Sequence, residues 1–381
     1  MPGSTPPGKV YNMARENMTA SLDLFKFTRF NSIHQWNLLF MFATILFADT
    51  LFISGLFIEG TYVNFTGEPS SFIAHVENPY VIENKDVCKN VTNLSCIVIV
   101  NTATFHFSRR ANMRDTWTNS KILKHHVIKT VFLLGRTSNR LVQTMIDNEQ
   151  ETFGDIVQGN FIDTYQNLSH KAVLGLRWVS ENCHHAKLVV KVDDDVFLDT
   201  FELLTRFENE YKYKTRHIWC PLRIPTNSVI YRGGRWKVAP NIFPNMTRYP
   251  FPNCMGFVVV ATNDTTRDLY QAAKVTSFFW IDDIFVYGML VQTTGRITMD
   301  RLTPVSIEEK DSFKCLRKSN GTQKCRLLVG RAVKETLMDK LWAKTLAIPN
   351  KFTKEELRDS GCVKQASYGD LGLHSKGKIS T

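Results

Sequence analysis

Residues 188–198 read LVVKVDDDVFL, and this stretch decides the fold that the sequence predicts. Its first five residues are apolar apart from Lys191 and are typical of a buried strand, and three adjacent aspartates follow, Asp193, Asp194 and Asp195. Adjacent carboxylates repel one another unless a cation or hydrogen-bond donors neutralise them. Hard cations such as Mn²⁺ or Mg²⁺ prefer oxygen ligands. An acidic surface turn does not need apolar residues on both sides, so we predict a divalent-cation site at the end of this strand.

Further apolar runs lie on both sides of this stretch along the chain. Ile97–Val100, Val131–Leu134 and Asp155–Val157 are predicted strands, and Asn167–Asn182 is a predicted helix with apolar residues near one face. Strands that alternate with helices indicate an α/β domain with a largely parallel sheet. Ligands of such sheets bind beyond the carboxyl ends of the strands, which is where the three aspartates are expected.

A second acidic cluster lies in WIDDIFVYG, residues 280–288. Asp282 and Asp283 have apolar neighbours on both sides, and one of them could deprotonate the hydroxyl group of an acceptor as a general base. The alternative is an N-cap pair, in which aspartates at a helix start stabilise free N–H groups and the helix dipole. The two interpretations are compatible.

Two further motifs carry weaker signals. In RRANMRDTW, residues 109–117, Arg110 and Arg114 are four positions apart and share a face if the segment is a helix. Two guanidinium groups could hold a diphosphate, and the alternative is a solvated basic face. YPFPNCMGF, residues 249–257, is expected to be a rigid loop in which Gly256 permits close approach of a ligand or another segment.

The N-terminal part of the chain predicts a membrane anchor. Leu38–Ile58 is an apolar run long enough to span a bilayer, although it contains Asp49. Basic residues precede the run and acidic residues follow it, which predicts a cytosolic N-terminus and a luminal remainder. All 8 cysteines lie after the run, as expected for an oxidising compartment. Glycosylation motifs also follow it, at Asn64, Asn90, Asn93, Asn167, Asn245, Asn263 and Asn320.

These features predict the organisation of all 381 residues. We expect a cytosolic tail (1–36), a transmembrane signal anchor (37–58), a luminal stem (59–87), a catalytic domain (88–348) and a C-terminal tail (349–381). The net charge of +11 favours anionic partners. A luminal domain does not meet nucleic acid, so the anionic partner expected here is a phosphorylated small molecule or the membrane surface.

Taken in order, the motifs of residues 88–300 resemble the inverting β-1,3-glycosyltransferase family. This family includes the β-1,3-galactosyltransferases, the β-1,3-N-acetylglucosaminyltransferases and, more distantly, fringe. Nematode-type members are similar in the Ile281–Val286 stretch. The resemblance implies an α/β fold of the GT-A, Rossmann-like type, a UDP-sugar donor, an Mn²⁺ requirement and a glycan acceptor on glycoprotein or glycolipid. It also implies a single-pass type II protein of the Golgi membrane.

The resemblance assigns roles to particular residues. Asp195 looks like the metal-binding carboxylate, with Asp193 beside it, and Asp193 and Asp194 would lie near the nucleotide. Asp283 looks like the catalytic base, with Asp282 as the second candidate. Arg110 and Arg114 fall in the family's N-terminal motif near the nucleotide.

The chain departs from the family pattern at several positions. Tyr287 precedes Gly288 where the family often has Thr or Val, His170 stands where Thr is usual, and no His follows Asp283 before His374, so a third metal ligand is not predicted. Galactose is the expected donor sugar, ahead of N-acetylglucosamine and N-acetylgalactosamine. Two functions without catalysis would also use such a domain: a luminal sugar-binding protein and a membrane-tethered adhesion module.

Overall fold

The structure is a computed structural model that describes residues 72–73, 77–119, 128–317 and 327–347. The chain separates into two compact units, Met1–Tyr62 and Val63–Thr381. The first unit, with the expected tail and membrane anchor, lies outside the described residues. Within the described part of the chain, no helix is long and apolar enough to cross a membrane.

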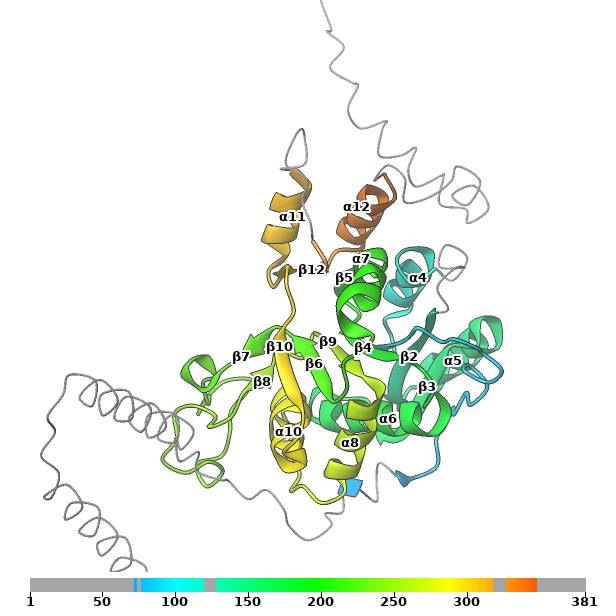
Figure 1. Cartoon of the computed structure of the whole chain (residues 1–381). Helices are drawn as coiled ribbons and strands as arrows, with labels where there is room; N and C mark the ends of the chain where they lie inside the picture. Colours follow the sequence, from blue (N-terminus) through cyan, green and yellow to red (C-terminus); the bar gives the residue numbers. More distant parts are fainter. Residues whose placement is uncertain (1–71, 74–76, 120–127, 318–326, 348–381) are drawn as a thin grey trace, which may run out of the picture. The chain divides into compact units, whose positions relative to one another are not determined.

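A seven-stranded mixed sheet forms the centre of the fold (Figure 1). In spatial order its strands are β10 (Thr298–Arg301), β6 (His217–Cys220), β9 (Val258–Thr262), β4 (Leu188–Asp193), β1 (Cys96–Asn101), β2 (Ile128–Arg136) and β3 (Ile156–Ile162). The four predicted strands are confirmed as β1, β2, β3 and β4, and they are mutually parallel. β9 runs antiparallel to both β4 and β6, which the sequence did not predict.

Helices cover both faces of the sheet because alternate residues of each strand point to opposite sides. On one face, Val98, Val190 and Val192 belong to a core shared with α4 (Phe107–Asp115), α7 (Thr200–Arg206) and α12 (Glu335–Leu346). On the other face, Ile99 and Val189 point toward α6 (Leu168–Asn182) and α8 (Asn263–Ala273). Figure 1 shows α4, α7 and α12 on the upper side and α6, α8 and α10 (Leu290–Thr294) on the lower side. α5 (Arg140–Phe153) packs beside β2 and β3.

Two small sheets hold the segments beside the central sheet. β5 (Val196–Leu198) directly follows the aspartates and pairs with β12 (Val329–Arg331), which also pairs with β11 (Val305–Ser306). β7 (Leu222–Arg223) pairs with β8 (Asn253–Cys254), and the Cys220–Cys254 disulfide lies at this ladder. α11 (Glu309–Arg317) precedes β12.

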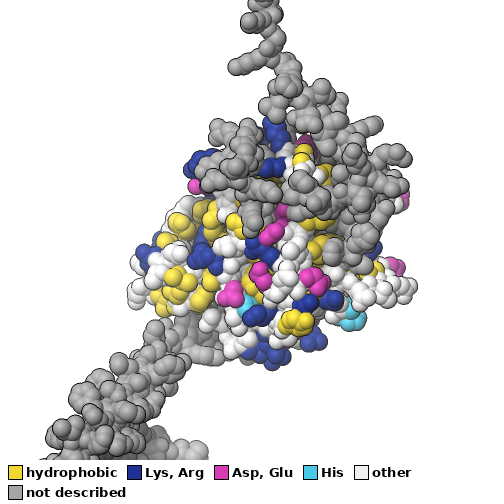
Figure 2. All heavy atoms as spheres, turned by 45° about the horizontal axis from the view of Figure 1, so that its top comes forward, with side chains coloured by type: hydrophobic (Ala, Val, Ile, Leu, Met, Phe, Trp, Pro, Cys, Tyr) yellow, Lys and Arg dark blue, Asp and Glu magenta, His cyan; other side chains and the backbone are white. Residues whose placement is uncertain are grey.

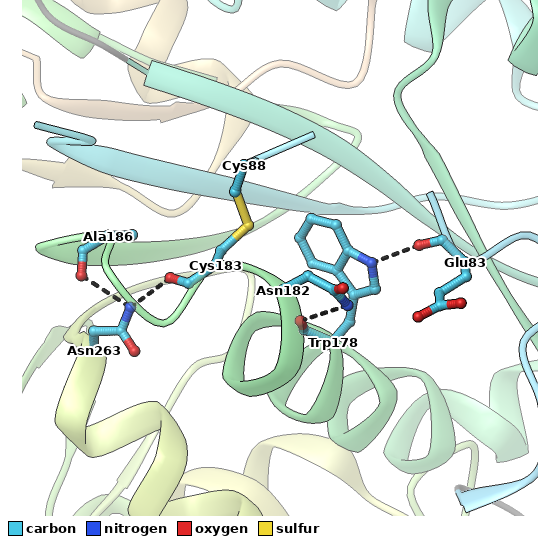
Figure 3. The surroundings of a disulfide bond; sticks show 7 residues. All are labelled: Glu83, Cys88, Trp178, Asn182, Cys183, Ala186 and Asn263. Carbon is cyan, nitrogen blue, oxygen red and sulfur yellow. Dashed lines mark hydrogen bonds between the residues drawn. A yellow bond between two sulfur atoms is a disulfide. The ribbon is translucent and has the colours of Figure 1, made fainter. Parts of the chain in front are cut away.

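A second disulfide, Cys88–Cys183, ties the start of the domain to the end of α6 (Figure 3). Asn263 at the start of α8 donates from its amide nitrogen to the carbonyl oxygens of Cys183 and Ala186, both at 2.9 Å. A glycan on Asn263 would replace one of these two donor hydrogens, so the structure argues against Asn263 as a glycosylation site.

The segment before Cys88, which is predicted to be stem, contacts the folded domain. Val81 and Ile82 donate backbone hydrogen bonds to Gln158 in β3, at 2.8 and 3.2 Å. The Trp178 indole of α6 donates to the Glu83 carbonyl at 2.6 Å (Figure 3). The contacts of the folded domain therefore begin before Cys88.

Candidate active site

The three aspartates lie at the carboxyl edge of the parallel strands. Asp193 ends β4 beside Asn101, which ends β1. Backbone hydrogen bonds then fix the turn: Asp193 donates to the Phe257 carbonyl at 3.0 Å, and Asp194 donates to the Asn101 carbonyl at 3.2 Å. The sheet therefore sets the direction of the acidic segment before any ligand binds.

Asp194 is neutralised by protein groups. Its carboxylate accepts hydrogen bonds from Thr102 Oγ1 at 2.7 Å and Arg109 Nη1 at 2.7 Å, and His106 Nδ1 lies 2.6 Å away. Burial alone would raise the pKa of Asp194, but these partners outweigh burial and lower it. Asp194 thus joins β4 to the segment after β1, and the sequence did not predict these three partners, although Arg109 is next to the predicted Arg110.

Asp193 and Asp195 keep part of their carboxylate surface open, with 39% and 18% of the side chains exposed. Arg331 of β12 lies 3.2 Å from Asp195. Burial and the charge of Asp193 nevertheless raise the pKa of Asp195. A carboxylate in this state is stabilised by an added cation.

Lys191 joins the first acidic cluster to the second. Its buried side chain reaches Asp193 Oδ1 at 2.7 Å and also donates to the carbonyl of Gly256. Burial opposes the charged form of Lys191, but Asp193, Asp282 and Asp283 outweigh burial and raise its pKa. One buried cation therefore lies among three carboxylates from segments far apart in the sequence.

The second cluster begins a helical segment. Asp282 and Asp283 open α9 (Asp282–Ile284), which continues into a π-helical turn, η5 (Phe285–Met289), and then into α10. Ile281 holds the N-cap position, so the N-cap interpretation of the two aspartates is wrong, although both lie in the first turn. Burial raises the pKa of both carboxyls, and for Asp282 the charge of Asp283 adds to the effect.

Gly256 gives Asp283 the space that its carboxylate occupies. A Cβ atom on Gly256 would lie 2.0 Å from Asp283 Oδ1, a distance that no pair of unbonded atoms tolerates. The Gly256 backbone N–H also donates to Asp283, which partly offsets the effect of burial on the pKa of Asp283. The close approach predicted for Gly256 is therefore a contact with the second acidic cluster.

The 249–257 loop packs against the same helical segment. A Cβ atom on Gly288 would lie 2.6 Å from the Phe251 ring, so Gly288 lets the π-helical turn pack closely on this loop. Cys254 in the loop is held by its disulfide to Cys220. The loop and the acid pair thus form one packed unit.

Arg110 and Arg114 do share a face of α4, as predicted, but both guanidinium groups contact carboxylates of the protein. Arg110 has no exposed surface and makes bonds of 2.6 to 3.0 Å to Glu149. Arg114 contacts Glu149 at 2.7 Å and makes two 2.8 Å bonds to Asp155. The interpretation of this segment as a solvated basic face is therefore wrong. A contact of Arg110 or Arg114 with the nucleotide stays a prediction.

The residues around Asp163 tie several strand ends together. Lys171 of α6 donates to Asp163 at 2.9 and 3.0 Å and to the Thr102 carbonyl at 2.6 Å. The backbone N–H of Gly135 in β2 donates to Asp163 at 2.8 Å. Lys171 is buried, so this cluster fixes the edge of the sheet on which the acids lie.

The donor set suits a divalent cation that is completed by a ligand. Among the described residues, no group of three or more His, Cys, Asp or Glu side chains is arranged to hold a metal ion. Asp193 and Asp195 supply carboxylate oxygens and remain partly open. Hard cations such as Mg²⁺ often take one or two carboxylates and complete their shell with substrate phosphates and water. The residues present therefore fit such a cation bound together with a phosphorylated ligand.

Comparison with known proteins identifies the family. The galactosyltransferase family profile matches residues 108–300, half of the chain. This chain belongs to the galactosyltransferase family. The matched range contains both acidic clusters, Lys191 and Gly256, and the predicted membership of the β-1,3-glycosyltransferases is confirmed.

Individual relatives are similar over part of their length. Beta-1,3-galactosyltransferase 1 of Mus musculus is 27% identical over 57% of this chain, and the match spans 65% of that relative. Lactosylceramide 1,3-N-acetyl-beta-D-glucosaminyltransferase A of Danio rerio is 28% identical over 55% of this chain and 56% of its own length. The match thus covers less than two thirds of either relative. Among solved structures, an apo structure of the WbbM bifunctional glycosyltransferase matches 70% of this chain and 51% of its own, at 12% identity and a TM-score of 0.36.

Proposed function

We propose that this chain is an inverting β-1,3-glycosyltransferase that moves a hexose, galactose in the first instance, from a UDP-sugar to the 3-hydroxyl of a glycan. The observation that carries the proposal is the meeting of two acidic clusters at Lys191 and Gly256. One cluster keeps two carboxylates open for a cation, and the other holds a carboxylate pair with raised pKa values. Perturbed carboxyls at the carboxyl edge of a parallel sheet favour a catalytic site over a structural one.

The proposed chemistry is a single displacement. The acceptor oxygen attacks the anomeric carbon as the bond from that carbon to the UDP oxygen breaks on the opposite face. Asp283 takes the proton of the attacking hydroxyl, and burial raises its pKa, which makes it a stronger base than an exposed aspartate. Asp195 and Asp193 would hold Mn²⁺, which supplies charge neutralisation for the leaving diphosphate when bound.

The remaining residues of the site position these groups. Lys191 holds Asp193 and the Gly256 carbonyl, and Gly256 in turn holds Asp283. Asp194 fixes the acidic segment through Arg109, His106 and Thr102. The site is therefore preorganised, which lowers the reorganisation that the reaction requires.

Where the protein acts is part of the proposal. We place the folded domain in the Golgi lumen behind the predicted anchor at 37–58, with the predicted cytosolic tail and C-terminal tail, and with the stem ending before the contacts of residues 81–83. The disulfides Cys88–Cys183 and Cys220–Cys254 support an oxidising compartment. The relatives include both a galactosyltransferase and an N-acetylglucosaminyltransferase, so N-acetylglucosamine is the second candidate for the donor sugar and N-acetylgalactosamine the third.

The test is a donor panel with the full chain solubilised in detergent. UDP release is measured with Mn²⁺ and a mixture of saccharides, for UDP-galactose, UDP-N-acetylglucosamine and UDP-N-acetylgalactosamine, with Asp283→Asn as the inactive control. We expect UDP-galactose to give the highest rate. Equal background rates for wild type and Asp283→Asn with all donors would leave a non-catalytic sugar-binding protein as the better account.

A further inference from the structure

An exposed aromatic cluster includes Trp280, which precedes the acid pair by two residues in the chain. Tyr231 and Trp236 expose 49% and 46% of their surface, and their rings are 5.7 Å apart. The Trp236 indole donates to the Tyr165 hydroxyl at 2.7 Å, and the Arg235 guanidinium lies 3.9 Å above the Tyr165 ring. The Tyr165 ring lies 6.4 Å from the Trp280 ring. Side chains from three distant segments thus form one cluster.

Two segments of the chain lead from the cluster toward Asp283. Trp280 is three residues before Asp283 in the chain, and the hydroxyl of Ser169 in α6 fixes the preceding residue by donating to the Phe279 carbonyl at 2.8 Å. The segment that carries Tyr231 and Trp236 continues into β8 and then into Gly256, which contacts Asp283. The Cα atoms of Trp280 and Asp283 can be at most about 11 Å apart, so the Trp280 end of the cluster lies near the proposed base.

The loop that carries Arg235 and Trp236 is preformed. Arg232 donates to the carbonyl oxygens of Ala239, Ile242, Phe243 and Met246, at 2.5 to 3.1 Å. Gly234 has a φ of +74°, a left-handed conformation that favours glycine and turns the chain at this point. The Val238 N–H closes the loop on the Tyr231 carbonyl at 2.8 Å. Exposed aromatic side chains on a rigid loop bind a ligand at a low cost in conformational entropy.

The chemistry of the cluster favours a saccharide. One face of a pyranose ring presents C–H groups that pack on an aromatic ring, while its hydroxyls accept and donate hydrogen bonds at the edges. Tyr and Trp combine an apolar ring with a polar group, and Arg235 adds donors. In Figure 2, hydrophobic and basic side chains gather on the left, the side on which Figure 1 shows β7 and β8.

We propose that Tyr165, Tyr231, Arg235, Trp236 and Trp280 form the acceptor subsite, on which a sugar ring of the glycan stacks beside Asp283. This inference rests on the proposed function. It assigns the donor to the aspartates after β4 and the acceptor to the aromatic cluster, so the two substrates are separable by mutation.

The experiment compares Trp236→Ala with Tyr213→Ala in the full chain. Tyr213 is the matched control because it is an aromatic side chain that is 84% exposed and lies outside the cluster. The probes are methyl β-galactoside, methyl β-N-acetylglucosaminide, lactose, N-acetyllactosamine and a desialylated glycoprotein, and the donor is the UDP-sugar that the wild type uses. Three quantities are measured: the acceptor KM, the donor KM and the slow hydrolysis of the donor without acceptor.

We expect Trp236→Ala to raise the acceptor KM roughly tenfold, equivalent to about 1.4 kcal/mol. The donor KM and donor hydrolysis should stay at the wild-type values, Trp236→Phe should restore most of the acceptor affinity, and Tyr213→Ala should match the wild type. An equal acceptor KM in Trp236→Ala and Tyr213→Ala would overturn the subsite. So would a loss confined to a desialylated glycoprotein acceptor, because that result assigns the cluster to protein contacts. A wild type that neither binds UDP nor hydrolyses any donor contradicts the proposed function instead.

Discussion

Two charged clusters of this domain differ in charge balance, and we call them the balanced and the unbalanced cluster. In the balanced cluster, between α4 and α5, Arg110 and Arg114 contact Glu149 and Asp155 in a network with as many cations as anions. Burial alone would raise the pKa of Glu149, but the two arginines outweigh burial and lower it. In the unbalanced cluster, Lys191 is the buried cation among Asp193, Asp282 and Asp283. The pKa values of Asp282 and Asp283 are raised there.

The difference separates folding from chemistry. The balanced cluster has its charges paired within the protein, so we expect its residues to act mainly on the stability of the domain. The unbalanced cluster carries excess negative charge, which costs stability in the free protein. Binding of a cation or a proton reduces this cost. We therefore expect substitutions in the balanced cluster to change stability and substitutions in the unbalanced cluster to change turnover.

The largest effect is expected for Asp283→Asn. Losing a general base typically lowers turnover about 10²–10⁴-fold, while UDP affinity should hold because the base acts on the acceptor proton. The melting temperature should hold or rise, since a buried negative charge is removed. Turnover, UDP affinity and thermal melts are compared with those of Asp282→Asn, which should be milder. A dead Asp282→Asn beside an active Asp283→Asn reverses the two roles.

Next in size is Glu149→Ala, which tests the balanced cluster. Removing one partner of a buried ion pair typically costs about 3–5 kcal/mol of unfolding free energy, because Arg110 is left buried without its carboxylate. Urea unfolding measures the loss, and the exposed Glu151→Ala on the same helix is the control. Turnover per folded molecule should match the wild type; a large fall in turnover with normal stability would place this cluster in the active site.

Gly256→Ala moves the base without removing it. The new methyl group would lie 2.0 Å from Asp283 Oδ1 and force the carboxylate to move, and a displacement of about 1 Å in a catalytic group costs roughly 10²-fold in rate. Gly154→Ala is the control: its left-handed φ of +63° makes the substitution costly for stability, yet it lies outside both acidic clusters. Wild-type turnover in Gly256→Ala would show that the base does not depend on this contact.

The pH profile separates the two clusters with the smallest perturbation. The base is active only when deprotonated, so its raised pKa makes kcat/KM fall on acidification from above the ordinary aspartate value of about 3.9, by up to about tenfold per pH unit. The pKa of Glu149 is lower in the folded protein than in the unfolded chain. The stability that Glu149 contributes is therefore fully present above its unfolded-state pKa and is lost only as the pH falls through its folded-state pKa. Activity should thus be lost while the melting temperature is retained, and an acid limb of kcat/KM at or below about pH 4 contradicts the assignment.

The sequence predicted the strands and acids better than their surroundings. Runs such as Leu188–Val192 are apolar at almost every position because parallel strands are buried on both faces, so the strands and the order of motifs were readable. The strands β6, β9 and β10 of the central sheet were not predicted. The direction of β9 could not be read in any case, because a hydrophobic pattern is the same for either direction. The partners of Asp194 and the link from Lys191 to Gly256 join segments 65 to 92 residues apart. Such pairings depend on tertiary structure and have no local pattern.

The partners of Arg110 and Arg114 could not be predicted from the sequence either. Their spacing correctly predicted a shared helix face, but spacing does not say what the face meets, and the partner Glu149 lies 39 residues after Arg110. Gly256 gave a better signal, because a glycine between prolines and an apolar strand is expected where another group approaches closely.

The central claim is that Asp193 and Asp195 bind a cation together with a phosphorylated donor, and calorimetric titration of UDP tests it most directly. Wild type, Asp195→Ala and Glu149→Ala are titrated with and without Mn²⁺, below the melting temperature of each. We predict Mn²⁺-dependent UDP binding in wild type and Glu149→Ala, and its loss in Asp195→Ala. Unchanged Mn²⁺-dependent affinity in Asp195→Ala would contradict the account.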